Sequence, residues 1–106
     1  MNLMSRAEEI ILLAILNLKE TAYGVSIQDF IQEKTNLTWS FAQIYDPLSK
    51  LVRKGYVRKF KGESTPERGG RQKCFYQITA EGRAALTEIR RIQDSVWAAV
   101  PKESPV

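Results

Sequence analysis

Basic residues gather in the middle of the chain, and their chemistry is the easiest to name. Within residues 50–73 they are Lys50, Arg53, Lys54, Arg58, Lys59, Lys61, Arg68, Arg71 and Lys73. Two acidic residues oppose these nine, so the segment carries a net charge of +7, against +4 for the whole chain. Charge concentrated in this way is typical of a surface that binds nucleic-acid phosphates. The alternative interpretation is a solvated surface with a chance cluster of cations. The charge favours phosphate binding over this alternative, because the cations repel one another unless an anion binds.

Other kinds of chemistry have few candidate residues. The chain has no histidine and a single cysteine, Cys74. The sequence therefore predicts no metal site, no cofactor and no enzyme activity. We expect Cys74 to be a small buried residue in a reducing, cytoplasmic protein. The apolar run at residues 10–16 is too short to span a membrane, so no membrane partner is expected.

Two helices are predicted before the basic segment. Ser5 and Glu8 have the spacing of a capping box, which begins a first helix that runs to about residue 19. This helix is apolar nearly all round, so we expect it to be covered on several sides. A second helix is predicted over residues 25–34.

A third helix is predicted over residues 40–54, closed by a left-handed Gly55. Its apolar stripe, assigned to the core, is Phe41, Ile44, Leu48, Leu51 and Val52. The opposite stripe is Ser40, Gln43, Pro47, Lys50 and Lys54. Gln43 is the side chain there best suited to a bidentate contact with adenine, with the two lysines on phosphates. Gln43 is equally well read as an ordinary solvated residue, and the sequence leaves both interpretations open.

Pro47 conflicts with a regular third helix. It lacks an N–H group and costs about 3 kcal/mol in a helix interior. Asp46 and Pro47 could instead begin a shorter helix, which would leave residues 40–45 as a separate turn. We expect one kinked helix over residues 40–54.

Two strands follow, at residues 56–61 and 73–79, and a glycine-containing basic segment at 62–72 separates them. A helix followed by such a hairpin is typical of a winged helix-turn-helix. There the helix enters the major groove and the hairpin tip lies along the backbone or minor groove. The predicted fold class is α+β, mainly α, with residues 1–79 as the winged helix-turn-helix domain.

A last helix is predicted over residues 80–100, before a frayed tail at 101–106. Its apolar seam is Ala85, Ile89, Ile92, Val96 and Val100. Much of this seam lies too far along the chain to pack on so small a domain. The sequence therefore predicts that this helix dimerises with a second subunit.

Trp97 lies on the distal part of that helix. It has two plain interpretations: packing on the first helix of the mate, or partial exposure near the end of its own helix. In a sharper interpretation, Trp97 and its symmetry copy flank a gap lined by Leu12 and Ile15. Two indole rings in that position would sandwich a flat aromatic effector.

Three blocks of residues carry a resemblance that extends from Ile10 to about Leu86. The first block is residues 22–27, Ala-Tyr-Gly-Val-Ser-Ile. The second is Ile44-Tyr45 with Leu48, Leu51 and residues 54–57, and the third is residues 69–73 with 75–82. In this order and spacing the blocks resemble the PadR family of transcriptional regulators, in its short branch with a single C-terminal helix.

The resemblance implies a homodimeric repressor that binds a palindromic operator in double-stranded DNA. Family members dimerise through the C-terminal helix, packed on the first helix of the mate, and several are released by small aromatic molecules. The family's recognition-helix tyrosine falls on Tyr45, and its wing residues fall on Gly69, Gly70, Arg71 and Lys73. Family members often have proline directly after the tyrosine, whereas here it is one position later, at Pro47.

A different class of function is compatible with the same fold. A winged helix can serve as a protein-interaction module that binds no DNA, because fold alone does not determine function. The charge on residues 50–73 favours DNA binding, since an interaction module has no need to concentrate charge there.

Overall fold

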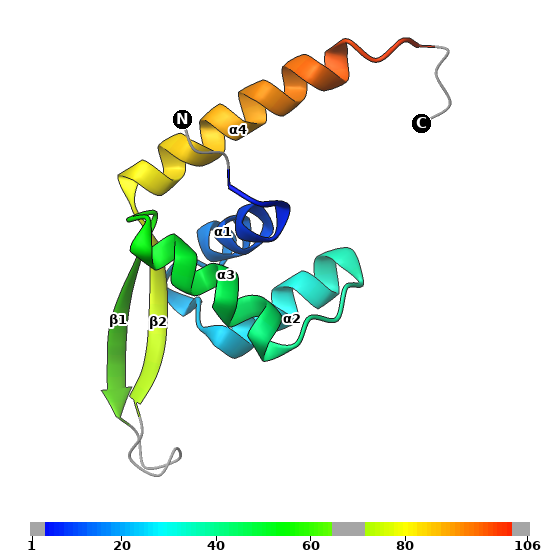
Figure 1. Ribbon diagram of the computed structural model, residues 1–106. Coiled ribbons are helices and arrows are strands. Elements are labelled where there is room, and N and C mark those ends of the chain that lie inside the picture. Colours follow the sequence, from blue (N-terminus) through cyan, green and yellow to red (C-terminus); the bar gives the residue numbers. More distant parts are fainter. Residues whose placement is uncertain (1–3, 65–71, 103–106) are drawn as a thin grey trace.

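The computed structural model describes residues 4–64 and 72–102, which form mainly helices beside one two-stranded sheet. The elements in chain order are α1 (Arg6–Leu18), the 3-10 helix η1 (Lys19–Thr21), α2 (Gly24–Thr35), α3 (Phe41–Arg53), β1 (Val57–Ser64), β2 (Gln72–Ile78) and α4 (Ala80–Ala98). In Figure 1 the hairpin of β1 and β2 extends away from α1, α2 and α3, while α4 begins near the base of the hairpin and runs across the top of the view, above α1. This architecture confirms the predicted α+β winged helix.

Side-chain caps fix where three of the helices begin. At α1, Ser5 Oγ accepts a hydrogen bond from the Glu8 N–H at 3.1 Å, and Glu8 Oε1 accepts one from the Ser5 N–H at 2.9 Å. This is the capping box that the sequence predicts. At α4, Thr79 Oγ1 accepts a hydrogen bond from the Gly82 N–H at 3.0 Å. Ser40 caps α3 in the same manner as Ser5 caps α1.

Pro47 lies inside α3, and the helix is continuous from Phe41 to Arg53. The expectation of one helix is therefore confirmed, and the alternative helix that begins at Asp46 is wrong. Two features offset the missing N–H of Pro47: the cap at Ser40, and burial of the apolar stripe on either side of the proline. The chain then turns at Gly55, whose φ of 80° lies in the left-handed region that glycine tolerates best.

The core forms where α1, α2 and α3 meet. Its largest fully buried side chains are Ile11, Leu12, Ile15, Ile27, Ile31, Ile44, Leu48 and Leu51. Each such side chain contributes about 1.5–3 kcal/mol relative to exposure. The core therefore holds α3 rigidly against α1 and α2, and it fixes which residues of α3 point outward.

The hairpin is joined to the helices by the segment between η1 and α2. Strands β1 and β2 pair antiparallel, with Phe60 opposite Phe75. On the other side of β2, the Tyr76 N–H donates to the Ala22 carbonyl at 2.9 Å, and Tyr23 forms a bridge to Phe75. The start of α2 is therefore held directly beside the hairpin. Cys74 is half-buried here, whereas the sequence predicts a small buried residue.

The seam predicted along α4 divides into two parts. Ala85 and Ile89 are buried within their own chain, whereas Val96 is 65% exposed. Ile92 and Val100 have intermediate exposure. Ala85 and Ile89 therefore pack within their own chain, and Val96 is the most exposed residue of the seam. Contact of the seam with a second subunit stays a prediction.

A related correction concerns α1. Leu12 and Ile15 are 0% and 1% exposed, because they point into the core of their own chain. The prediction that they line a gap between two subunits is therefore wrong. Leu13 is the large apolar residue of α1 that is exposed, with 40% of its area accessible. Within the described residues, no helix combines the length and the apolar character needed to cross a membrane.

Candidate nucleic-acid interface

The exposed surface of α3 has two flanks that face different neighbours. On one flank Tyr45 packs against Gly24, the first residue of α2, so closely that a Cβ atom at Gly24 would lie 2.0 Å from the Tyr45 hydroxyl oxygen. On the other flank Gln43 and Pro47 border a groove of about 400 Å³, which they share with Ala7 of α1. The first flank therefore adjoins the hairpin, because the start of α2 is joined to β2. The second flank adjoins the first turn of α1.

Two aromatic side chains occupy the first flank of α3. Phe41 and Tyr45 are 49% and 41% exposed, and their ring centroids lie 6.1 Å apart. The prediction that Phe41 belongs to the core is wrong, because Phe41 lies in the first turn of α3, at the edge of the apolar stripe. Phe41 and Tyr45 thus form an exposed pair of large rings on the flank of α3 that packs against Gly24.

Ser40 and Gln43 form the capping box that begins α3. Ser40 Oγ accepts a hydrogen bond from the Gln43 N–H at 3.2 Å, and Gln43 Oε1 accepts one from the Ser40 N–H at 2.8 Å. A bidentate contact with adenine uses both the oxygen and the nitrogen of a glutamine amide. Such a contact would compete with the cap. The stripe pattern in the sequence assigns both residues to the DNA-facing side and misses this role, although the Ser-x-x-Gln spacing is the signal that could have indicated it.

Lys54 lies at the end of α3, where the sequence suggests a phosphate contact. Its Nζ atom lies 2.7 Å from Oε2 of Glu8, whose side chain is only 7% exposed. Burial raises the pKa of the Glu8 carboxyl, but hydrogen bonds from Lys54 and Ser5 outweigh burial and leave the pKa below its ordinary value. The Lys54 ammonium is thus engaged within the chain. Lys50, one turn earlier, is exposed.

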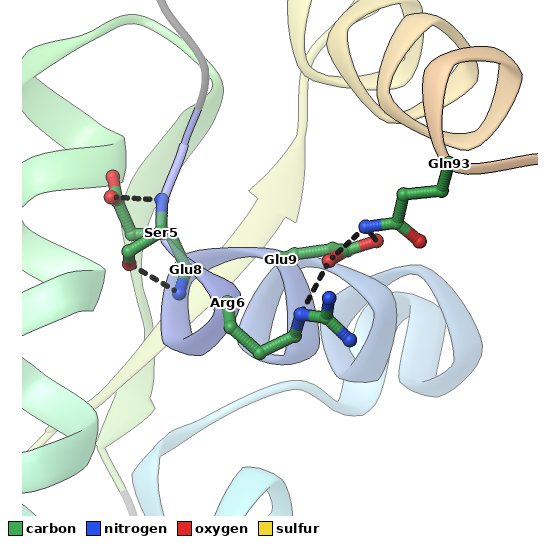
Figure 2. A network of polar contacts seen from close by, with 5 residues as sticks. All are labelled: Ser5, Arg6, Glu8, Glu9 and Gln93. Atoms are coloured by element: carbon green, nitrogen blue, oxygen red, sulfur yellow. Dashed lines mark hydrogen bonds and ion pairs between the residues drawn. The ribbon is translucent and has the colours of Figure 1, made fainter. Parts of the chain in front are cut away.

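Two consecutive glutamates at the start of α1 point in opposite directions (Figure 2). Glu8 reaches α3, whereas Glu9 accepts hydrogen bonds from Gln93 Nε2 of α4 at 3.1 and 3.3 Å. Glu9 also pairs with Arg6 at 3.5 Å. The first turn of α1 therefore joins the end of α3 to the distal half of α4. Of these roles, the sequence predicts only the capping role of Glu8.

The hairpin presents cations along both strands. Arg58, Lys59 and Lys61 of β1 are exposed, and Arg58 donates to Gln77 Oε1 of β2 at 2.7 Å. Lys73 Nζ lies 3.9 Å from the ring centroid of Tyr23, in a cation–π contact. The remaining predicted wing residues lie outside the described residues: Arg68, Gly69, Gly70 and Arg71.

Aromatic rings support these cations from within the hairpin. Phe75 stacks on Phe60 at 5.9 Å between centroids and meets Tyr23 edge-on at 5.7 Å. Beside them Tyr76 is buried, and burial, with smaller contributions from Tyr45 and Cys74, raises the pKa of Tyr76 to about 12. Tyr76 is therefore neutral at physiological pH and adds no negative charge next to the basic strands.

A second open surface lies between α1 and α4. A groove of about 460 Å³ runs there, bordered by Leu13 and Leu16 of α1 and by Leu86 of α4. Beyond it, near the end of α4, Trp97 is 62% exposed. The floor of this groove is apolar at the three leucines, while Arg83, Arg90 and Asp94 also line it. The groove and the exposed end of α4 are separate surfaces of the chain.

Comparison with known proteins agrees with this arrangement. The model of the PadR-like family of transcriptional regulators matches residues 12–88. The chain belongs to this family. The resemblance inferred from the sequence is thereby confirmed. A search among curated proteins finds no match.

Several solved structures share the fold of this PadR-like chain. A transcriptional regulator from Clostridium thermocellum has a TM-score of 0.76 and 22% identity, over 93% of this chain and 90% of its own. A PadR family transcription regulator from Clostridium difficile has a TM-score of 0.70 and 22% identity, over 86% and 91%. A PadR-like transcriptional regulator from Bacillus cereus has a TM-score of 0.70 and 22% identity, over 86% and 84%.

Proposed function

We propose that this PadR-like protein is a DNA-binding transcriptional repressor. In this proposal α3 enters the major groove and the hairpin contacts the neighbouring phosphates. The observation that supports it most is the exposed Phe41–Tyr45 flank of α3, where Tyr45 packs against Gly24. The neighbouring Tyr23 is bridged to β2 and has the Lys73 ammonium over its ring. One side of the protein thereby offers groups for base edges and charges for the backbone, the two kinds of contact that sequence-specific binding needs.

The proposed DNA-binding form is a homodimer. Val96 and Trp97 are 65% and 62% exposed at the end of α4, and Leu13 is 40% exposed beside the groove between α1 and α4. If the end of α4 from each copy docks against that groove in the other copy, both apolar surfaces are covered. The two α3 helices would then read half-sites about 10 bp apart in a palindromic operator.

The proposed dimer also offers a place for a small aromatic effector. Trp97 presents its exposed indole near the surface that the second copy would cover. A flat aromatic molecule that stacks on Trp97 would release DNA only if it bound the DNA-free arrangement more tightly. Titration with planar aromatic dyes tests this, with Trp39→Phe isolating the fluorescence of Trp97. Quenching that persists unchanged in Trp97→Ala, read through Trp39, would contradict an effector site at Trp97.

The DNA-binding proposal is tested by selecting fragments from the source genome. Bound fragments should share an inverted repeat, and affinity should fall steeply as salt rises, because phosphate contacts release counterions. Sedimentation of the complex should give two protein chains per site. The absence of affinity for any fragment at low salt would instead favour the alternative of a winged-helix interaction module.

A further inference from the structure

We propose that Phe41 reads DNA sequence by contact with the C5 methyl group of thymine, and that Tyr45 holds the Phe41 ring in position. This inference rests on the proposed DNA binding and names the base that α3 recognises. It concerns the N-terminal end of α3, where recognition helices present the side chains that reach base edges. Phe41 is the first residue of α3, immediately after the Ser40 cap.

Two of the polar candidates on α3, Gln43 and Lys54, are engaged elsewhere. Gln43 Oε1 accepts the Ser40 N–H at 2.8 Å, and Lys54 is paired with Glu8 at 2.7 Å. Both lie on the flank that faces α1. The flank beside the hairpin carries Phe41 and Tyr45, whose rings are 49% and 41% exposed.

The chemistry of a phenyl ring restricts what it can recognise. Phenylalanine has neither a hydrogen-bond donor nor an acceptor, so it cannot pair with the polar edges of guanine, adenine or cytosine. The methyl group of thymine is the apolar feature of the major groove, and phenylalanine is one of the side chains that contact it. Phe41 therefore favours thymine at the position it faces.

The Phe41 ring is supported before any DNA arrives. The capping box fixes the backbone at Ser40, and Tyr45 lies under Phe41 with 6.1 Å between ring centroids. Tyr45 packs directly against Gly24. Its hydroxyl group occupies the space that a side chain at position 24 would need. A side chain held in this way loses little conformational entropy on binding. Tyr45 is in this sense a positioning residue, and Phe41 makes the contact.

The test uses a DNA duplex recovered by the genomic selection and a second duplex in which deoxyuridine replaces every thymidine. The two differ only in the C5 methyl groups. The wild-type protein should bind the thymine duplex about fourfold more tightly for each contacted methyl group, and about fifteenfold for one methyl in each of two half-sites. Replacement of thymines one at a time should locate the weakened binding at symmetrical positions.

Variants connect this preference to Phe41. Phe41→Ala should bind both duplexes with the affinity that the wild type has for the uracil duplex, whereas Phe41→Leu should keep part of the preference. Phe60→Ala is the matched control, because Phe60 is a similarly exposed aromatic residue, at 39%, on the hairpin. Phe60→Ala should keep the full thymine preference whatever its absolute affinity. Circular dichroism confirms that each variant is folded.

The outcomes separate this inference from the proposed function. If the wild type binds both duplexes equally tightly, methyl reading is wrong while DNA binding stands. If Phe41→Ala retains the thymine preference, another residue reads the methyl group and the assignment to Phe41 is wrong. If the wild type binds neither duplex at low salt, the proposed function and this inference fail together.

Discussion

Lys54 Nζ and Glu8 Oε2 lie 2.7 Å apart and join the end of α3 to the first turn of α1. The Glu8 side chain is 7% exposed and that of Lys54 is 34% exposed. Removal of one partner leaves the other charge partly desolvated, and this costs more than the pair itself contributes. The pair therefore constrains where α3 ends relative to α1.

Lys54→Met should lower the free energy of unfolding by about 1–3 kcal/mol, because it leaves the buried Glu8 carboxylate without its cation. The double variant Glu8→Gln/Lys54→Met should lose less than the sum of the two single variants, since no unpaired charge remains. Urea denaturation of the four proteins measures both effects. Additive losses would show that the two side chains are not coupled.

Acid should destabilise the protein partly through Glu8. The pKa of this carboxyl is lowered in the folded protein, so the native state holds its proton less strongly than the unfolded chain, where the pKa is about 4.3. The contribution of Glu8 is therefore present above that pH and is lost as the pH falls through the folded pKa. Glu8→Gln should flatten the decline in stability as the pH falls below about 4.3. If stability falls as steeply with pH in Glu8→Gln as in the wild type, other carboxyl groups cause the acid destabilisation.

The effect of Gly24→Ala on stability should change sign when Tyr45 is replaced by alanine. In the wild type, the new Cβ would lie 2.0 Å from the Tyr45 hydroxyl oxygen, so the substitution should destabilise by about 1–3 kcal/mol. In a Tyr45→Ala background that clash is absent. The higher helix propensity of alanine should then stabilise by up to about 1 kcal/mol. Thermal unfolding of both pairs tests this, and a destabilisation of equal size in each background would exclude Tyr45 as the obstacle.

The salt dependence of DNA binding should distinguish cations that contact phosphate from those paired within the protein. Lys61→Ala should reduce the slope of log affinity against log salt by about 0.9 for each phosphate that the protein no longer neutralises. Lys54→Met should leave that slope unchanged, because Lys54 is already paired with Glu8. Fluorescence anisotropy at several salt concentrations measures both variants. An equal reduction by the two would mean that Lys54 leaves Glu8 to bind DNA.

The sequence predicts the elements well because their signals are local. The capping box at Ser5, the left-handed Gly55 and the apolar stripe through Ile44 all act within a few residues. The sequence is less informative about which neighbour covers a helix. The first helix is apolar nearly all round, so its pattern could not show that Leu12 faces its own core while Leu13 reaches the surface.

The candidate site shows the same limit. Periodicity assigns Phe41 to the core because it shares a stripe with Ile44, yet Phe41 lies in the first turn of α3 and is 49% exposed. The pairing of Lys54 with Glu8 spans 46 residues of sequence, and no local signal predicts a contact of that kind. The Ser40 cap, in contrast, has a local signal in the Ser-x-x-Gln spacing, which the assignment of both residues to DNA contact overlooked.

Dimerisation through the end of α4 is best tested at Val96. Val96→Glu places a charge on a side chain that is 65% exposed in the single chain, so the fold should be unaffected. Ile92 is less suitable, because it is half-buried against its own chain and its replacement would also disturb folding. Removal of the apolar packing, worth about 1.5–3 kcal/mol per side chain, together with the desolvation of a charge should give a monomer with weak operator affinity.

Ala98→Glu supplies the matched control for this change. Ala98 is exposed and lies two residues after Val96, which places it on nearly the opposite side of α4. The same charge there should leave the dimer and its operator affinity intact. Sedimentation at micromolar concentration compares the two variants with the wild type. If Val96→Glu remains as dimeric as Ala98→Glu, the subunits meet through another surface, and the groove between α1 and α4 is open to a different partner.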